Sequence, residues 1–268
     1  MRKIVTPTCK LPNLNYQPML TQFENHFGDR EVGSITSEEV LSFLTKINKD
    51  TKQTTKRLRY ALLNAFFNLI KNTLDKKIQN LCDTMILRKI FRNTRGIQWT
   101  IFEKETIDEI IFKTTNLRNR LMLELMARGG MRIGEVLKIR PRDVDSRKII
   151  LRAPKSGRES ELVFIPQKVA DRLKEYIRVN NIDLDQRIYP LTYGGVREIV
   201  KRAGKLAGVT LKSHDLRRHA ATYASRSGTP IEIVSKVILR HANLSTTQRY
   251  LGKVSDAEAV RWIENLYD

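Results

Sequence analysis

The sequence predicts a mainly α-helical protein with one small β-sheet, organised as a small helical domain followed by a larger, mostly helical domain. Apolar residues recur through most of the chain at the three- and four-residue spacing of amphipathic helices. Two β-rich runs flank a turn at 154–158, which predicts a β-hairpin. The helical periodicity breaks around Gly96, which predicts a linker between the two domains.

The first domain is expected to span residues 1–92 and to be entirely helical. A short amphipathic helix covers 16–26, and a second begins at Ser37, where acidic residues follow in the first turn as helix starts favour. A third helix is expected over 52–74 and a fourth from 76 to about 91. The apolar face expected for the third helix contains Leu58, Ala61, Leu62, Ala65, Phe66 and Leu69.

The second domain is expected to span residues 103–268, after a linker over 93–102. Its very apolar helix at 117–127 ends at Gly129 and Gly130, because glycine tolerates the left-handed dihedral angles of helix ends. The hairpin strands are expected at 148–152 and 161–165. The other helices are expected at 103–111, 133–138, 168–180, 195–207, 214–227, 231–239 and 256–266.

The formal net charge of +20 indicates a polyanionic partner. Residues 1–100 carry +9 and residues 101–268 carry +11, so the excess is spread over both predicted domains. Nucleic acid is the simplest such partner, and neutralising its phosphates makes binding strongly salt-dependent. From charge alone, a ribosome-associated protein or a binder of anionic membranes is the alternative.

Cys9 and Cys82 are the two cysteines, and they lie far apart without a C-x-x-C pattern. They indicate a reducing compartment and no cysteine-based zinc site, with a disulfide between them as the alternative. The first ten residues are basic and lack the apolar stretch of a secretory signal. The sequence has no run of about 18 apolar residues, so no membrane helix is expected. We therefore expect a cytoplasmic, nucleoid-associated protein.

Four segments contain residues of types that take part in catalysis. Segment 129–135 reads G-G-M-R-I-G-E and segment 153–158 reads A-P-K-S-G-R. Further on, 213–219 reads S-H-D-L-R-R-H and 239–250 reads L-R-H-A-N-L-S-T-T-Q-R-Y. Each motif alone is unspecific, but the ordered set resembles the tyrosine recombinase (integrase) family over essentially the whole chain. The short two-domain Xer-like resolvases and simple integrases are the most similar members.

The resemblance implies a C-shaped clamp around duplex DNA, made of a helical, SAM-like core-binding domain and an α+β catalytic domain. It implies a site-specific recombinase that cuts and rejoins DNA through a 3′-phosphotyrosine intermediate, without metal, ATP or another cofactor. Matched position by position, the family's catalytic set falls on Arg132, Lys155, His214, Arg217, His241 and Tyr250.

The chemistry explains why these residue types are needed. Displacement at a phosphodiester adds negative charge to the non-bridging oxygens, which the planar, permanently charged guanidinium groups of Arg132 and Arg217 can bind. Glu135, three residues after Arg132, can orient that arginine on a helix. By the resemblance, Tyr250 is the nucleophile and His241 hydrogen-bonds the phosphate.

Lys155 is expected at the tip of the hairpin, where by the resemblance its ammonium protonates the leaving 5′-oxygen. Arg152 and Arg158 are nearby competitors for that role. Arg218 shares a helical face with His214 as well as Arg217 does, so only the resemblance selects Arg217. Arg240 departs from the family pattern, which usually has glycine at this position. Tyr267, in an acidic context, is the alternative nucleophile.

The start of the helix at 52–74 is densely basic. Lys52, Lys56 and Arg59 share one face at i, i+4 and i+7, and we expect this face to contact DNA phosphates. A solvated basic face without a partner is the alternative.

The tail, 255–268, carries a large apolar face that includes Trp262. By the resemblance, this C-terminal helix docks into a neighbouring subunit of a homo-tetramer assembled on double-stranded DNA with paired half-sites. Packing of the tail on its own domain is the alternative. The competing functions are a type IB topoisomerase and a DNA-binding module that has lost catalysis.

Overall fold

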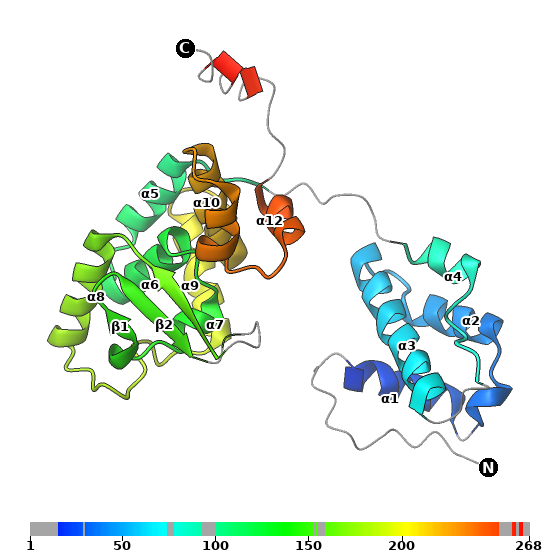
Figure 1. The fold of residues 1–268 in the computed structure, drawn as a ribbon. Coiled ribbons are helices and arrows are strands. Elements are labelled where there is room, and N and C mark those ends of the chain that lie inside the picture. Colours follow the sequence, from blue (N-terminus) through cyan, green and yellow to red (C-terminus); the bar gives the residue numbers. More distant parts are fainter. Residues whose placement is uncertain are drawn as a thin grey trace. The chain divides into compact units, whose positions relative to one another are not determined.

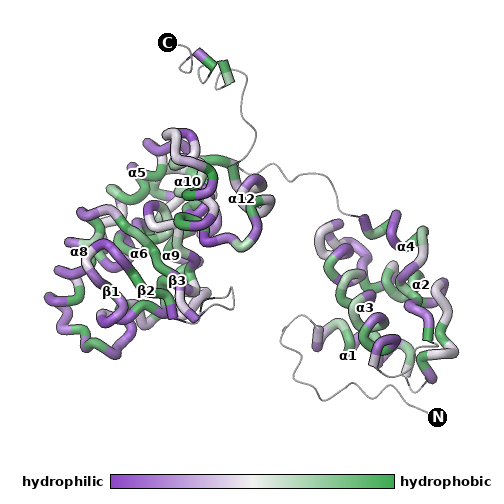
Figure 2. Tube along the Cα trace, viewed as in Figure 1, coloured by the Kyte–Doolittle hydropathy of each residue, from purple (hydrophilic) through white to green (hydrophobic). Residues whose placement is uncertain are grey.

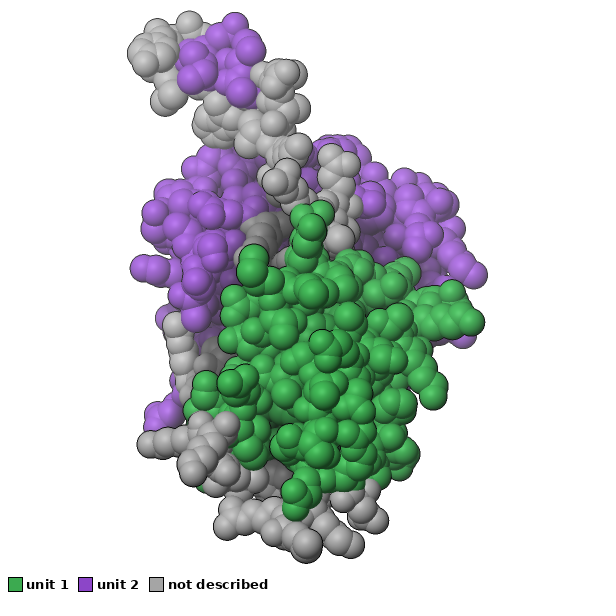
Figure 3. Space-filling view, turned by 90° about the vertical axis from the view of Figure 1, so that its right-hand side faces the viewer, with its two compact units in different colours: residues 1–97 green, residues 98–268 purple. Residues whose placement is uncertain are grey.

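The computed structural model describes residues 16–28, 30–73, 78–92, 100–152, 154, 159–251, 259–260 and 263–264. The chain forms two compact units, residues 1–97 and 98–268, which Figure 3 shows in different colours. The expected fold class is confirmed, since these described residues are mainly helical with one small antiparallel sheet. Each unit has its own hydrophobic core.

Unit 1 is a helical bundle in which α1 and α2 pack on the long helix α3 (Figure 1). The Thr36 side chain caps α2 by accepting a hydrogen bond from the backbone amide of Glu39. The Glu39 carboxylate in turn accepts from the backbone amide of Thr36. At the centre of the core the ring of Phe23 lies 5.5 Å from that of Phe43 and 5.8 Å from that of Phe67. The helices are α1 (Tyr16–Phe27), the 3-10 turn η1 (Val32–Ser34), α2 (Ser37–Ile47), α3 (Gln53–Thr73) and α4 (Met85–Ile90).

The helix expected over 76–91 is wrong in most of its described length. Only α4 is helical there, and residues 78–84 form bends and turns. Asn80 explains the turn, because its side-chain oxygen accepts from the Cys82 amide in the manner of an Asx turn. The Cys82 carbonyl in turn accepts from the phenol of Tyr60, at 3.0 Å. Tertiary contacts therefore replace helical bonds in this segment.

The face expected for α3 is also partly wrong. Leu58 and Leu69 are 46% and 42% exposed, whereas Leu63 and Phe67 are fully buried. Leu62 and Phe66 are buried as expected. Apolar residues occur around much of this helix, so two overlapping sets satisfy the same spacing. The packing of α1 and α2 determines which set is covered.

Unit 2 surrounds the apolar helix α6 (Leu117–Arg128), which packs on α5, α8 and α10. Along the helices of both units the hydropathy alternates between apolar and polar, as helices that bury one face require (Figure 2). The other helices are α5 (Lys104–Lys113), α7 (Ile133–Val136), the 3-10 turn η2 (Pro141–Asp143), α8 (Gln167–Val179), α9 (Tyr193–Lys205), α10 (Ser213–Arg226), α11 (Ile231–Ile233), the π-helical turn η3 (Val234–Ile238) and α12 (Leu244–Leu251).

The sheet has three antiparallel strands in the order β1 (Val144–Asp145), β2 (Lys148–Arg152) and β3 (Ser160–Phe164). The two hairpin strands are as expected, with Ile149 opposite Val163, and the two-residue strand β1 is an addition. In β3, Val163 is buried and its neighbours Leu162 and Phe164 are each 46% exposed. This alternation also places Glu161 on the buried face.

A small third core joins α10, η3 and α12. Ala221 of α10 packs with Val234 and Leu239, and Tyr250 of α12 packs against them. The sequence did not predict α12, which contains that tyrosine. No helix among the described residues is long and apolar enough to cross a membrane.

Candidate active site

Arg132 lies at the start of α7, directly after the turn that ends α6. Gly130 makes this turn at φ +60°, and a Cβ atom there would meet the Ile238 carbonyl oxygen at 2.7 Å. The position therefore requires glycine for its dihedral angles and for its lack of a side chain. The backbone amide of Arg132 donates to Glu135 Oε2 at 2.9 Å, and its guanidinium donates to Oε1 at 2.5 Å. The expected i, i+3 contact is confirmed.

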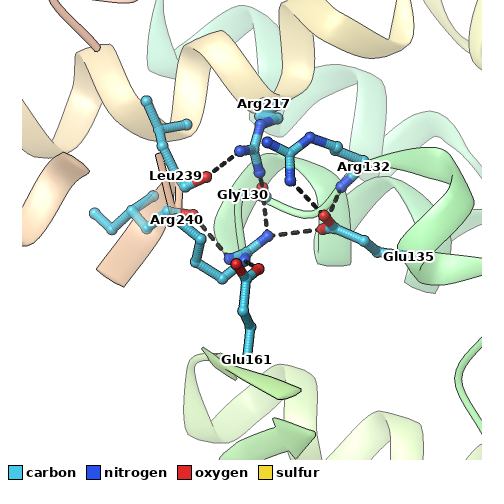
Figure 4. A network of polar contacts seen from close by, with 8 residues as sticks. Gly130, Arg132, Glu135, Glu161, Arg217, Leu239 and Arg240 are labelled. Carbon is cyan, nitrogen blue, oxygen red and sulfur yellow. Dashed lines mark hydrogen bonds and ion pairs between the residues drawn. The ribbon is translucent and has the colours of Figure 1, made fainter. Parts of the chain in front are cut away.

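Arg217 projects from α10 and is 1% exposed. Its two terminal nitrogens donate to the carbonyl oxygens of Gly130 and Leu239 (Figure 4). Burial lowers its pKa, and the nearby charges of Arg132 and Arg240 lower it further. An arginine remains protonated at neutral pH in spite of such shifts, so Arg217 is a fixed positive charge.

His214 lies in the first turn of α10 and is exposed. Burial of part of its ring lowers its pKa, as do the charges of Arg217, Arg218 and Arg132. With Arg132 and Arg217 it lines a cavity of about 810 Å³. Among the described residues, the cavity is also lined by the basic side chains of Lys138, Arg140, Arg142, Arg152 and Arg187. The cavity is therefore suited to a polyanion.

His241 is held by two hydroxyl groups. Its Nδ1 lies 3.0 Å from Thr247 Oγ1, and that hydroxyl donates to Ser235 Oγ at 2.8 Å. The backbone amide of His241 also donates to the Ser235 carbonyl at 2.9 Å. Burial lowers the pKa of His241 to about 4, with further contributions from Arg217, Arg132 and Arg240. The imidazole is therefore neutral near pH 7.

The hydroxyl pair also controls which nitrogen of His241 carries the proton. When Thr247 donates to Ser235, it can only accept from the ring, so Nδ1 is protonated and Nε2 is left as an acceptor. When both hydroxyls reverse, Thr247 donates to Nδ1 and the proton moves to Nε2. The pair thus allows His241 to act as acceptor or donor at Nε2 without taking on charge.

Tyr250 lies in α12, with its ring 5.0 Å from that of His241 in an edge-on arrangement. The guanidinium carbon of Arg218 lies 5.6 Å from the centre of the Tyr250 ring. Arg218 is also paired with Asp215 at 2.9 Å and is only 5% exposed. The two adjacent arginines therefore lie in different places: Arg217 contacts the Gly130 turn and Arg218 contacts the tyrosine.

Four of the predicted site residues remain. Lys155 lies outside the described residues. In unit 1, Lys52 is exposed and precedes the first residue of α3, and Lys56 is half-buried. Arg59 is also half-buried, and its guanidinium donates to the Ile47 carbonyl and, at 3.2 Å, to Asn48 Oδ1. The role of these three residues in DNA binding stays a prediction.

The sequence model of the phage integrase family matches residues 101–256, more than half of the chain. The chain belongs to the phage integrase family. It is therefore a DNA strand-exchange enzyme of the tyrosine recombinase type, as the sequence predicted.

Named relatives agree with the family assignment, and solved structures share the fold. The tyrosine recombinase of Thermosipho africanus is 28% identical over 271 residues, covering 94% of this chain and 91% of that one. Tyrosine recombinase XerA of Pyrococcus horikoshii is 26% identical over 228 residues, covering 81% and 76%. A lambda integrase dimer bound to a COC′ core site has a TM-score of 0.70 at 17% identity, covering 94% of both chains. XerH bound to a palindromic difH substrate has a TM-score of 0.73 at 20% identity, covering 94% and 79%.

The structure adds residues to this integrase site that sequence reasoning missed. Arg240 and Glu161 are buried beside Glu135 (Figure 4), and Thr247 and Ser235 hold His241. The sequence marked Arg240 as a departure from the usual glycine, but nothing in a single sequence indicates its two carboxylate partners. Thr247 lies within the recognised motif, yet its partner Ser235 lies on a different segment.

We predict that Thr247→Val slows DNA cleavage by this integrase without weakening DNA binding. Valine keeps the shape of threonine but removes the hydroxyl that orients His241 and determines which of its ring nitrogens carries the proton. By analogy with histidine ligands that lose an outer partner, the loss should be about 10–100-fold. Single-turnover cleavage measures the loss, and ¹⁵N NMR of the imidazole measures the tautomer.

Thr246→Val is the matched control, since its hydroxyl makes no contact with His241 among the described hydrogen bonds. An unchanged cleavage rate and tautomer in Thr247→Val would refute the role assigned to this hydroxyl.

Proposed function

We propose that this integrase is a site-specific recombinase in which Tyr250 attacks a DNA phosphate and forms a 3′-phosphotyrosine. The observation that carries the proposal is a continuous set of contacts among the candidate residues. Arg132 and Arg217 are joined through Glu135, Arg240 and the Gly130 carbonyl, and the next residue, His241, has its ring against that of Tyr250. Residues 118 positions apart in the sequence, Arg132 and Tyr250, thus belong to one site.

The charges of the site suit this reaction. The guanidinium groups of Arg132 and Arg217 can bind the non-bridging oxygens, where negative charge increases in the transition state. Both are oriented before the substrate arrives, Arg132 by Glu135 and Arg217 by two carbonyl oxygens. Such preorganised donors need no rearrangement as the charge develops.

The bonds and protons balance without an outside energy source. The bond from phosphorus to Tyr250 Oη forms as the bond to the 5′-oxygen breaks. The phenol proton passes to one of the two neutral imidazoles, His214 or His241. We assign protonation of the 5′-oxygen to Lys155, on the resemblance alone. Because the phosphotyrosine conserves the energy of the phosphodiester, rejoining needs no ATP.

The proposed substrate is double-stranded DNA with paired half-sites. The net charge of +20 and the basic cavity of unit 2 favour a polyanion. The lambda integrase and XerH structures similar to this chain contain DNA sites. We assign unit 1 to core binding, with Lys52, Lys56 and Arg59 on phosphates, and unit 2 to catalysis.

We also propose that subunits assemble as a tetramer on DNA through the tail. Val260 and Ile263 support this, since they are 56% and 58% exposed and an exposed apolar face is a candidate interface. The other apolar residues of the tail, including Trp262, lie outside the described residues.

Neutralising Lys52, Lys56 and Arg59 together with glutamine should weaken binding to duplex DNA and flatten its dependence on salt. The slope of log affinity against log salt should fall by about 0.9 for each phosphate that the variant no longer neutralises. The matched control neutralises three exposed lysines of the same unit, Lys46, Lys49 and Lys71. Equal slopes for the two triple variants would show that the predicted face makes no special contact.

Deleting residues 255–268 should spare binding of one subunit to a half-site and abolish cooperative occupancy of the full site. The reason is that the deletion removes the apolar face that we propose to be buried in the neighbouring subunit. Gel shifts on full-site and half-site duplexes measure both effects. Cooperative binding by the truncated protein would refute docking of the tail in trans.

The decisive test of the proposed function is Tyr250→Phe. DNA sites are first recovered from cells with this variant, which should bind but not cut. A nicked duplex carrying the recovered site should then trap the parent protein as a covalent adduct, and the variant should give none, since only the attacking hydroxyl is missing.

An adduct formed by Tyr250→Phe would move the nucleophile to another residue, and Tyr267→Phe would then be tested. Relaxation of supercoiled DNA without exchange between two sites would instead favour the topoisomerase-like alternative.

A further inference from the structure

Arg240 occupies a position that is unfavourable for arginine in two respects. Its φ is +51°, in the left-handed region that favours glycine, and its side chain is 2% exposed. A charged side chain is costly to bury and a Cβ atom is costly at this φ. The family usually has glycine here, which would avoid both costs. Contacts made by the guanidinium must therefore offset them.

Those contacts connect the two arginines proposed to bind phosphate. The guanidinium of Arg240 donates to Glu135 Oε2 at 2.7 Å, and Glu135 is the carboxylate that orients Arg132. It also donates at 3.3 Å to the Gly130 carbonyl, which Arg217 contacts as well. A further bond of 2.9 Å reaches the carbonyl of Ile238, the last residue of η3. Arg240 is thus bonded to a partner of each phosphate-binding arginine.

Glu161 supplies a second negative charge beside Arg240. It lies on the buried face of β3, and its side chain is 3% exposed. Neither of its oxygens accepts a hydrogen bond within the described part of the chain, but Oε2 forms an ion pair with Arg240 Nε at 3.6 Å. A carboxylate buried in a sheet needs such a counter-charge. Glu161 and Arg240 therefore compensate each other across two elements.

We propose that Arg240 is a positioning residue for cleavage: its guanidinium, balanced by Glu161, fixes Glu135 and the Gly130 carbonyl and so aligns Arg132 and Arg217 on the phosphate. This inference rests on the proposed function, since the phosphate is the ligand that the two arginines would bind. Arg240 itself does not line the cavity, so it acts through its neighbours.

The effect of Arg240→Gly distinguishes this role from a tolerated substitution. Glycine relieves the backbone at φ +51° and restores the residue usual in the family, so a merely tolerated arginine could be replaced without loss or with a gain. If Arg240 positions the site, the same change slows cleavage. Arg240→Asn is a second variant with the same logic, because asparagine tolerates this conformation and is too short to reach the carboxylates.

The experiment uses the duplex recovered with the Tyr250→Phe protein and measures single-turnover cleavage and equilibrium binding separately. We expect Arg240→Gly and Arg240→Asn to cleave about 100-fold more slowly at saturating protein, the loss expected from a misplacement of about 1 Å. Binding to the same duplex should stay near the parent value. Cleavage at the parent rate or faster would overturn the proposal.

A second measurement separates positioning from the cost of an unpaired buried charge. In Arg240→Gly, Glu161 loses its counter-charge, which lowers thermal stability; adding Glu161→Gln should restore stability, because the amide carries no charge. Cleavage should remain slow in the double variant, because Arg240 no longer holds Glu135. Recovery of cleavage together with stability would show a purely structural role.

A matched control removes a different arginine that neutralises a buried glutamate. Arg172 pairs with Glu124 at 2.6 Å, and Glu124 is 1% exposed, but neither residue lines the cavity. Arg172→Gln should lower stability and leave the cleavage rate of the folded protein unchanged. Equal slowing by Arg172→Gln and Arg240→Gly would overturn the specific role of Arg240.

A readout without cleavage keeps this inference separate from the proposed function. Binding of inorganic phosphate is measured by ³¹P NMR. The parent protein should bind it in a way that depends on Arg132. Arg240→Gly and the double variant should bind it more weakly. If the parent forms no covalent adduct, the proposed function fails while this measurement still tests the alignment. Equal phosphate affinity in the parent and in Arg240→Gly would overturn the alignment.

Discussion

The arrangement of the site depends on one buried carboxylate, that of Glu135. It accepts from the backbone amide and guanidinium of Arg132 and from the guanidinium of Arg240. Burial alone would raise its pKa, but Arg240 and the contacts with Arg132 reverse the effect, and the pKa lies below its ordinary value. Glu135 is therefore negative at neutral pH. Without this charge, Arg132, Arg217 and Arg240 would repel one another in a poorly solvated region.

The Gly130 turn provides the second constraint. Its carbonyl accepts from both Arg217 and Arg240, and its Cα leaves no room for a side chain against Ile238. The close approach brings the end of α6 to the π-helical turn η3, which precedes Arg240 and His241. A π-helical turn places the following residues differently from an α-helix and is common at functional sites. Three segments far apart in the sequence thus meet at one carbonyl oxygen.

The sequence predicted most helices of unit 2, though not α12, together with the hairpin and the ordered catalytic motifs, because each of these leaves a local pattern. It could not choose between Arg217 and Arg218 by spacing, and the structure places the two differently: Arg217 contacts the Gly130 turn and Arg218 contacts the Tyr250 ring. It failed where tertiary contacts override local preference, as in residues 78–84 and the face of α3. The partnership of Glu161 with Arg240 joins a strand to a turn 79 residues later, so no local pattern records it.

The charges of the site also explain how neutral histidines can serve it. Three guanidinium groups face two carboxylates, Glu135 and Glu161, which leaves an excess of one positive charge. That excess adds to burial in lowering the pKa of His241 to about 4. A bound phosphodiester brings one negative charge and removes the excess, so it raises the pKa of His241 again. In the reaction that we propose, binding of the substrate would thereby make the imidazole a better acceptor for the phenol proton of Tyr250.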